Sequence, residues 1–158
     1  MRVLYFDVVR KTDLESQLRV EYQSLKELLK QSDIVVIACP LTNDTRHMIG
    51  EEEFASMKNS AFLINVARGE IVDHEAMVQA VRHRVIGGVG LDVFNKEPIP
   101  VDDPLLGLDN IILTPHLSAN TIECRRRMAL TVAEDVLRVL HGQTPRYAVN
   151  LQTPTATS

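Results

Sequence analysis

The sequence predicts an α/β protein built on a doubly wound, mostly parallel β-sheet with helices on both faces. Two observations lead to this fold class. Short apolar runs rich in strand-forming residues alternate along the chain with segments of helical period. The run IVVIAC, residues 34–39, is continuously apolar, which is typical of a parallel strand that is buried on both faces. Right-handed crossovers between such strands place helices above and below the sheet.

The strands are expected at five runs, taken here in chain order. Residues 2–7 (RVLYFD) are rich in strand formers and end in an acid, and a polar stretch without a predicted element follows them. Pro40 ends the run at residues 33–40, and glycines weaken the strand pattern of the run at residues 85–94. These later strands are expected at residues 33–40, 61–67, 85–94 and 110–116.

Each expected helix has a start or stop signal. Ser24 and Glu27 have the spacing of a capping box, acids fill the first turn of EEEFASM, and Asp73 caps a third helix. Gly142 ends a long amphipathic helix. The four helices are expected at residues 24–31, 51–57, 73–83 and 120–141.

Composition narrows the partners and the compartment. The chain carries a net charge of −4, and its only basic run, Arg125–Arg127, is interpreted as a solvated helix face, so we expect no nucleic-acid partner and no membrane association. The longest apolar run, residues 34–39, is far too short to span a bilayer. Cys39 and Cys124 make no disulfide framework, and no signal peptide is recognised, so we expect a cytoplasmic location.

Polar side chains follow the ends of the predicted strands. In doubly wound sheets, ligands bind outside the carboxyl ends of the strands. The sequence therefore predicts a ligand site along one edge of the sheet. The residues that follow the five strands are Asp7, Cys39 with Pro40, Arg68, Asp92 and His116.

Asp7 and Arg68 each have two interpretations. Asp7 either accepts hydrogen bonds from the ribose hydroxyls of NAD, which would disfavour NADP, or opens a turn. Arg10 and Lys11 lie close by in the sequence and would weaken that cofactor preference. Arg68 either clamps a carboxylate with both arms of its guanidinium or pairs with the neighbouring acids of residues 70–73 (Glu70 and Asp73).

Three further residues have the chemistry of a proton-transfer site. His116 is either a proton donor or a histidine packed at a strand end. Glu97 is either a solvated loop acid or a partner that favours the imidazolium form of His116. Asp92 lies in the apolar stretch GLDVF, where a buried acid needs partners, and it accepts either from a cofactor amide or from backbone donors.

Four motifs together resemble the D-isomer-specific 2-hydroxyacid dehydrogenases. They occur in the order typical of that family and cover nearly all of residues 1–150. The resemblance implies a Rossmann-like fold and an NAD-dependent oxidoreductase that interconverts a small D-2-hydroxy acid and a 2-oxo acid by hydride transfer, working as a homodimer. The motifs are SLKELLKQSDIVVIACPLTNDTRHMI, LINVARGEIVDHEAMVQAV, GGVGLDVFNKEP and NIILTPHLSANT.

The resemblance also implies roles for individual residues. Arg68 would orient the carboxylate and carbonyl of the substrate, His116 would protonate the carbonyl oxygen, and Glu97 would keep His116 protonated. No metal ligands are implied. The residues implied to contact the cofactor are Asp7, Cys39, Pro40, Val66, Ala67, Arg68, Asp92, His116, Ser118 and Ala119.

One hallmark of the family is absent from the sequence. No G-x-G-x-x-G turn occurs, and GGVGLDV follows the wrong element. In the family this turn and its strand precede the strand that ends at Asp7. In the usual order 3-2-1-4-5-6, the absent strand would lie between the strands ending at Asp7 and Ala67.

We therefore interpret residues 1–150 as a partial dinucleotide-binding domain that lacks its first βα unit, and residues 151–158 as a disordered tail. The isolated chain is expected to bind NAD poorly and to turn over little substrate. Two alternatives stand beside the enzyme: a non-catalytic NAD-binding or protein-interaction module of the corepressor kind, and an inactive truncated remnant. The retention of Arg68, Glu97 and His116 favours the enzyme.

Overall fold

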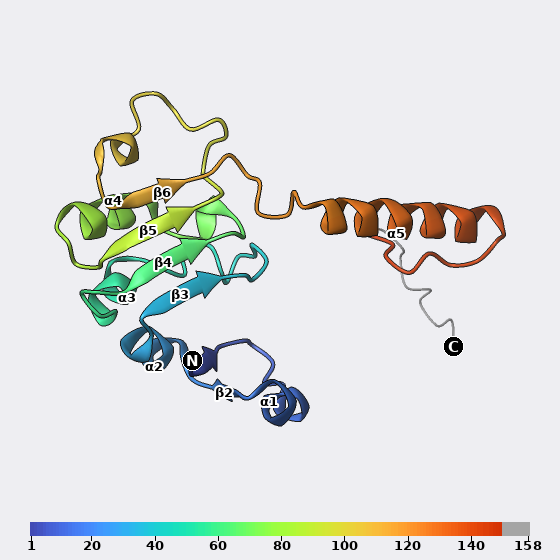
Figure 1. The fold of residues 1–158 in the computed structure, drawn as a ribbon, viewed down its shortest axis with the longest axis horizontal. Helices are drawn as coiled ribbons and strands as arrows, with labels where there is room; N and C mark the ends of the chain where they lie inside the picture. Colours follow the sequence, from blue (N-terminus) through green and yellow to red (C-terminus); the bar gives the residue numbers. More distant parts are fainter. Residues whose placement is uncertain (150–158) are drawn as a thin grey trace, which may run out of the picture. The chain divides into compact units, whose positions relative to one another are not determined.

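The computed structural model describes residues 1–149, and the tail predicted at residues 151–158 lies outside them. The chain divides after Leu117 into two compact units, which are described separately. In the first unit, parallel strands alternate with helices (Figure 1), so the predicted α/β class is confirmed.

The main sheet has four strands in the order β3-β4-β5-β6, and every neighbouring pair is parallel. The register pairs Ile37 with Asn65, Asn65 with Leu91, and Leu91 with Leu113. The carboxyl ends of all four strands therefore lie in one row, as the sequence predicts. The strands are β3 (Ile34–Ile37), β4 (Phe62–Asn65), β5 (Gly88–Leu91) and β6 (Ile111–Leu113).

A second, two-stranded parallel sheet pairs β1 (Val3–Tyr5) with β2 (Val20–Tyr22), and α1 (Thr12–Leu18) connects them. Both α1 and β2 lie in the polar stretch after the first strand, for which no element was predicted. The signal was weak because β2 has only three residues with Glu21 at its centre, and α1 has no buried side chain.

The predicted position of an open slot in the sheet is also wrong. The sequence places it between the strands ending at Asp7 and Ala67, but β3 directly pairs with β4. The error follows from the missed strand β2: without it, every later strand is assigned a position one place too early in the order 3-2-1-4-5-6.

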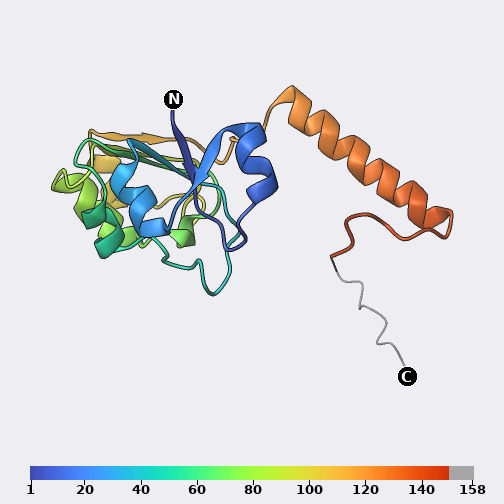
Figure 2. The ribbon, with the colours of Figure 1, turned by 90° about the horizontal axis from the view of Figure 1, so that it is seen from below.

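Three helices cover one face of the four-stranded sheet (Figure 2). Two of them begin at the predicted caps: Ser24 accepts from the backbone N–H of Glu27, and the Asp73 carboxylate accepts from that of Ala76 at 2.9 Å. The buried side chains on this face include Leu29, Phe54, Met77, Val81 and Leu63. The helices are α2 (Leu25–Gln31), α3 (Glu51–Ser56) and α4 (His74–Arg82).

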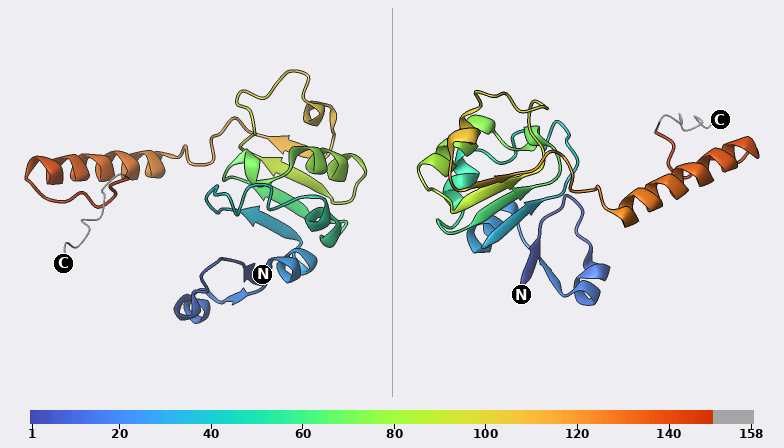
Figure 3. Two further views of the ribbon diagram at one scale, coloured as in Figure 1. Left: turned by 180° about the vertical axis from the view of Figure 1, so that it is seen from behind. Right: turned by 45° about the horizontal axis from the view of Figure 1, so that its top comes forward.

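The opposite face of the sheet stays exposed within the first unit. Ile34 and Val36 of β3 are 60% and 59% exposed, while Val35 and Ile37 are buried. The prediction that this strand is buried on both faces is therefore wrong for the described residues. The expected helices on both faces of the sheet are likewise not found in the first unit, where helices cover one face of the four-stranded sheet. The connection from β5 to β6 contains the short helix η2 (Pro104–Gly107) and extends beyond β6, the edge strand (Figure 3).

The second unit contains the long helix α5 (Ile122–Leu140). Thr121 caps its start by accepting from the N–H of Cys124 at 3.1 Å, and Gly142, with a φ of 71°, follows its end as predicted. After the helix the chain turns back, and the backbone N–H groups of Arg146 and Tyr147 donate to the Asp135 carboxylate.

Among residues 1–149 there is no helix with both the length and the apolar character that crossing a membrane requires.

Candidate active site

The loops that leave β4, β5 and β6 carry the three residues predicted to be catalytic. Arg68 follows β4, Glu97 follows β5 in the connection to β6, and His116 follows β6. Because the carboxyl ends of these strands are aligned by the register, the three loops begin at the same edge of the sheet.

His116 and Glu97 are in direct contact. The Nδ1 atom of His116 lies 2.9 Å from Oε2 of Glu97, and the other carboxylate oxygen accepts from the backbone N–H of Phe94 at 3.0 Å. Both hydrogen bonds lower the pKa of the Glu97 carboxyl, and the bond with His116 has the larger effect. The His116 side chain is 49% exposed, so it is not a histidine packed at a strand end, and Glu97 is not merely a solvated loop acid.

His116 has an uncommon backbone conformation. Its φ is 55°, in the left-handed region that residues other than glycine rarely adopt, and its N–H donates to the Thr114 carbonyl at 3.1 Å. This tight turn presents the imidazole to solvent at the carboxyl edge of the sheet.

Arg68 is exposed in the loop after β4, and its Nη1 donates to the carbonyl of Ala67 at 2.7 Å. The two acids considered as alternative partners of Arg68 are engaged elsewhere: Glu70 binds Arg46 at 2.6 Å, and Asp73 caps α4. The charge of Arg68 also contributes to the lowered pKa of Glu97, so the guanidinium lies within electrostatic reach of the His116–Glu97 pair.

Gly69 fixes how closely the Arg68 loop approaches the segment that leads to Glu97. A Cβ atom at Gly69 would lie 2.2 Å from the carbonyl carbon of Phe94 and 2.4 Å from the nitrogen of Asn95. Only glycine permits this backbone-to-backbone contact, which explains why a glycine directly follows Arg68.

Asn65, at the end of β4, is a buried residue that the sequence did not reveal as part of the site. Its Nδ2 donates to the carbonyl of Arg68 at 2.9 Å, and its Oδ1 accepts from the N–H of Ala67 at 3.0 Å. The available signal was an amide inside the apolar run AFLINVA, because a buried amide requires hydrogen-bond partners.

Asp92, at the end of β5, is buried and engaged with the loop that carries His116. One carboxylate oxygen accepts from the Thr114 hydroxyl at 2.5 Å and from the N–H of Leu117 at 2.8 Å. Of the two interpretations of Asp92, the structure therefore shows acceptance from a backbone donor. Thr114 is a second residue that the sequence did not single out.

Asp7 and Cys39 lie near each other at the ends of β1 and β3. The Asp7 carboxylate is exposed and accepts from the N–H of Val9 at 3.1 Å, so it does open a turn. Burial raises the pKa of the Cys39 thiol, and the charge of Asp7 raises it further. Pro40 is exposed, and its carbonyl accepts from the Thr45 hydroxyl at 2.8 Å.

The neighbouring Arg10 is held by other groups. It binds the Glu15 carboxylate with two hydrogen bonds of 2.7 and 2.8 Å, and its guanidinium lies 5.3 Å from the ring centroid of Tyr22. The bond from Arg10 is the main cause that lowers the pKa of Glu15 to about 2. Its charge is therefore balanced by Glu15.

The remaining predicted cofactor contacts differ in their surroundings. Val66 is 37% exposed at the end of β4, next to the partly buried Ala67. Ser118 and Ala119 belong to the second unit, so their place in the site stays a prediction. Among the described residues, no group of three or more His, Cys, Asp or Glu side chains is arranged to hold a metal ion.

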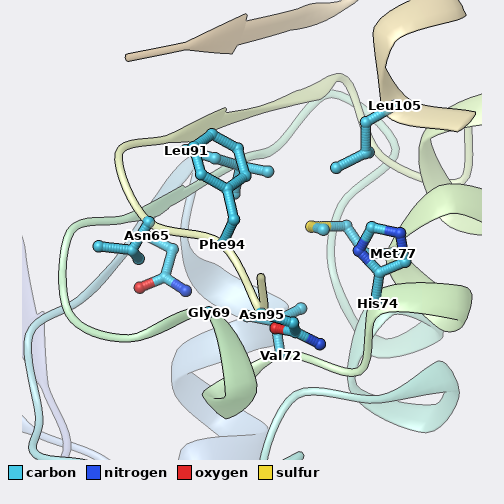
Figure 4. Close-up of a pocket in the computed structure, with 10 residues that line it drawn as sticks. Asn65, Gly69, Val72, His74, Met77, Leu91, Phe94, Asn95 and Leu105 are labelled. Carbon is cyan, nitrogen blue, oxygen red and sulfur yellow. The ribbon is translucent and has the colours of Figure 1, made fainter. Parts of the chain in front are cut away.

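A small cavity lies beneath the loops that follow β4 and β5 (Figure 4). Asn65, Gly69, Phe94 and Asn95 line it on the side of these loops, and His74 lines it from α4. Its volume is about 10 Å³, which is room for one water molecule and far too little for a substrate. Arg68 and His116 are both exposed and do not line this cavity.

Comparison with known proteins gives one consistent result. Residues 1–118 match the profile of the D-isomer specific 2-hydroxyacid dehydrogenase, NAD binding domain. A glyoxylate reductase from Korarchaeum cryptofilum is 48% identical over 150 residues, which cover 95% of this chain and 45% of that protein. The chain thus spans a little under half the length of the curated relatives it matches.

Two solved structures superpose on most of this chain. A D-lactate dehydrogenase with NAD⁺ from Lactobacillus jensenii superposes with a TM-score of 0.85 at 33% identity, over 94% of this chain and 48% of that one. A glyoxylate reductase from Paecilomyes thermophila gives a TM-score of 0.82 at 34% identity, over 91% of this chain and 44% of that one.

Proposed function

The chain belongs to the D-isomer specific 2-hydroxyacid dehydrogenase family, and from this premise we propose that it carries the catalytic residues of an NAD-dependent oxidoreductase that reduces a small 2-oxo acid to a D-2-hydroxy acid. The observation that carries the proposal is the 2.9 Å contact between His116 and Glu97, within electrostatic reach of Arg68 at the carboxyl edge of the sheet.

The residues present fit the ribose and nicotinamide parts of NAD. The exposed Asp7 carboxylate is a pure acceptor, as two ribose hydroxyls require, and Cys39 and Pro40 would border the adenosine. Val66 and Ala67 provide a small apolar surface for a planar ring, and Asp92 would accept from the carboxamide. The chemistry that NADH supplies when bound is hydride donation to the substrate carbonyl carbon.

Arg68 is proposed to bind the substrate. A 2-oxo acid carries a carboxylate beside its reacting carbonyl, and a guanidinium binds a carboxylate with two parallel hydrogen bonds. This two-point contact fixes the direction of the neighbouring carbonyl as well as its position.

His116 is proposed to supply the proton. Negative charge develops on the carbonyl oxygen during reduction, and a protonated imidazole at that oxygen neutralises the charge by proton transfer. Glu97 contacts Nδ1, so Nε2 is the ring atom that would face the substrate. In the oxidative direction, neutral His116 would remove the hydroxyl proton.

The substrate class is proposed from the same chemistry. The names of the relatives point to glyoxylate and lactate, which share a carboxylate next to the reacting carbon. The free thiols of Cys39 and Cys124 support a reducing compartment such as the cytoplasm. A homodimer stays a prediction from the family resemblance.

A chimera tests the proposal. The portion of the Korarchaeum cryptofilum glyoxylate reductase that aligns with this chain over 150 residues is replaced by this chain. We expect NADH-dependent reduction of glyoxylate and pyruvate but not of acetaldehyde or acetone, which lack the carboxylate that Arg68 would bind. A folded chimera that binds NADH yet reduces none of these compounds, or reduces all four equally well, contradicts the proposal. The first outcome would favour a non-catalytic module.

A further inference from the structure

We propose that Asn65 and Asp92 are positioning residues: Asn65 fixes the loop that presents Arg68, and Asp92, together with Thr114, fixes the turn that presents His116. This inference rests on the proposed function, because the two loops matter for that function. Asn65 contacts the backbone carbonyl of Arg68, whereas Asp92 contacts Thr114 and Leu117 on either side of His116.

The first support is burial. Asn65 and Asp92 are 1% and 4% exposed, and they are the two polar residues in the buried core of the described chain. A buried polar side chain is costly unless its hydrogen bonds are made. The two residues end neighbouring strands, and the N–H of Asp92 donates to the carbonyl of Asn65 at 3.0 Å.

The second support is the pattern of bonds at Asn65. Its amide donates to the carbonyl of Arg68 and accepts from the N–H of Ala67, so one side chain holds two consecutive residues of the loop. Both a donor and an acceptor are needed at this place. An aspartate, which has the same shape, would retain the bond from Ala67 but would place a carboxylate oxygen against the carbonyl of Arg68.

The third support is the pair of bonds on either side of His116. Thr114 and Leu117 flank the histidine in sequence, and both donate to the same oxygen of Asp92. The left-handed backbone of His116 is unfavourable for a residue with a side chain, so the turn persists only where its surroundings hold it. A carboxylate suits this task because hydrogen bonds to a charged acceptor are stronger than neutral ones.

Together these bonds anchor the loop of the carboxylate-binding group to the end of β4 and the turn of the proton donor, which follows β6, to the end of β5. The separation of Arg68 and His116 is then set by the pairing of β4 with β5 and of β5 with β6, and not by two independently moving loops. Catalytic groups held in this way keep the geometry that reaction requires.

The first test uses the 158-residue chain without cofactor or substrate. Thr114→Val removes the hydroxyl donor at an exposed position, and Thr114→Ser keeps it. The titration of the Glu97 carboxyl is followed by carbon NMR in each protein. We expect the pKa of Glu97 to move toward its ordinary value in Thr114→Val, because the turn no longer holds His116 against it. In Thr114→Ser it stays low.

Equal Glu97 titration in Thr114→Val and Thr114→Ser overturns the role of Asp92 and Thr114. A second measurement needs no substitution: the amide of Leu117 in the unaltered chain should exchange slowly with solvent, because it donates to the buried Asp92. Exchange as fast as in a free peptide also overturns the inference.

The second test compares two Asn→Asp changes in the chimera. The Asn110 amide, before β6 at the opposite end of the sheet, also donates to backbone carbonyls, those of Val81 and Gly87. We expect Asn65→Asp to lower kcat/KM for glyoxylate at least tenfold and Asn110→Asp to change it less than twofold, although both lower the melting temperature. Equal effects on kcat/KM overturn the role of Asn65.

The two failures remain distinguishable. An inactive chimera with the expected Glu97 titration and slow Leu117 exchange contradicts the proposed function and leaves the positioning bonds established. Two results with an active chimera contradict the positioning role alone. One is equal Glu97 titration in the two Thr114 variants, and the other is an equal effect of Asn65→Asp and Asn110→Asp on kcat/KM.

Discussion

The change Gly69→Ala isolates the packing that brings the Arg68 loop to the rest of the site. The added Cβ would lie 2.2 Å from the carbonyl carbon of Phe94 and 2.5 Å from its oxygen, and both atoms are backbone atoms that no rotamer change can move. Ordinary carbon–carbon contact begins near about 3.5 Å, so the loop must retreat by about 1.3 Å.

A retreat of this size has a calculable consequence for catalysis. Misplacing a substrate-binding group by about 1 Å costs on the order of 100-fold in rate, so we expect kcat/KM for glyoxylate in the chimera to fall by about that factor. The strain of the added methyl group should also lower the free energy of unfolding by about 1–3 kcal/mol. Steady-state kinetics and thermal unfolding measure the two effects.

Gly107→Ala is the matched control. A Cβ at Gly107 would meet no atom within 4 Å, so the same chemical change should leave both kcat/KM and stability nearly unaltered. If kcat/KM of Gly69→Ala lies within twofold of that of Gly107→Ala, the close packing at Gly69 does not position Arg68.

Three further predictions follow from the same geometry. Arg68→Lys should raise KM for glyoxylate about 10- to 100-fold, because one charge-assisted hydrogen bond to the carboxylate is lost; an unchanged KM would contradict the clamp. Because the folded-state pKa of Glu97 is lowered, its contact with His116 stabilises the fold fully above the ordinary carboxyl pKa of 4.5 and loses this effect as the pH falls through the lowered value. Near neutral pH, the free energy of unfolding of Glu97→Gln should therefore lie about 0.2–1 kcal/mol below that of the unaltered chain, which is the range for an exposed ion pair. The difference should vanish in acid. A difference that does not change with pH would contradict this linkage. Asp7→Ser should increase the ratio of kcat/KM for NADPH to that for NADH, since no negative charge then repels the 2′-phosphate, and an unchanged ratio would exclude Asp7 from the ribose site.

Much of the fold could be read from local signals. Ser24 and Asp73 cap α2 and α4 where the sequence places them, because capping depends on neighbouring residues alone. The alignment of polar residues along one sheet edge also follows from sequence, since parallel strands bring their carboxyl ends together. The contact between His116 and Glu97 was foreseen as a possibility on the same grounds, and the family motifs then singled it out.

Other features depend on tertiary context and left little trace in the sequence. Strand β2 is short and has Glu21 at its centre, so neither length nor periodicity marked it. Ile34 and Val36 are apolar but exposed in the described unit, because burial depends on what packs against a face and not on the residues of the face. Asn65 and Thr114 act through backbone groups of other loops, which a linear pattern does not reveal.

The central claim is that the imidazole of His116 delivers the proton while a hydride reaches the substrate carbon. Its most direct measurement is the single-turnover reduction of glyoxylate by the chimera with NADH, compared between the unaltered chain and His116→Gln at equal NADH saturation. The account predicts that the rate of NADH oxidation falls about 10²- to 10⁴-fold in His116→Gln while NADH binding is unchanged. An undiminished single-turnover rate would contradict it.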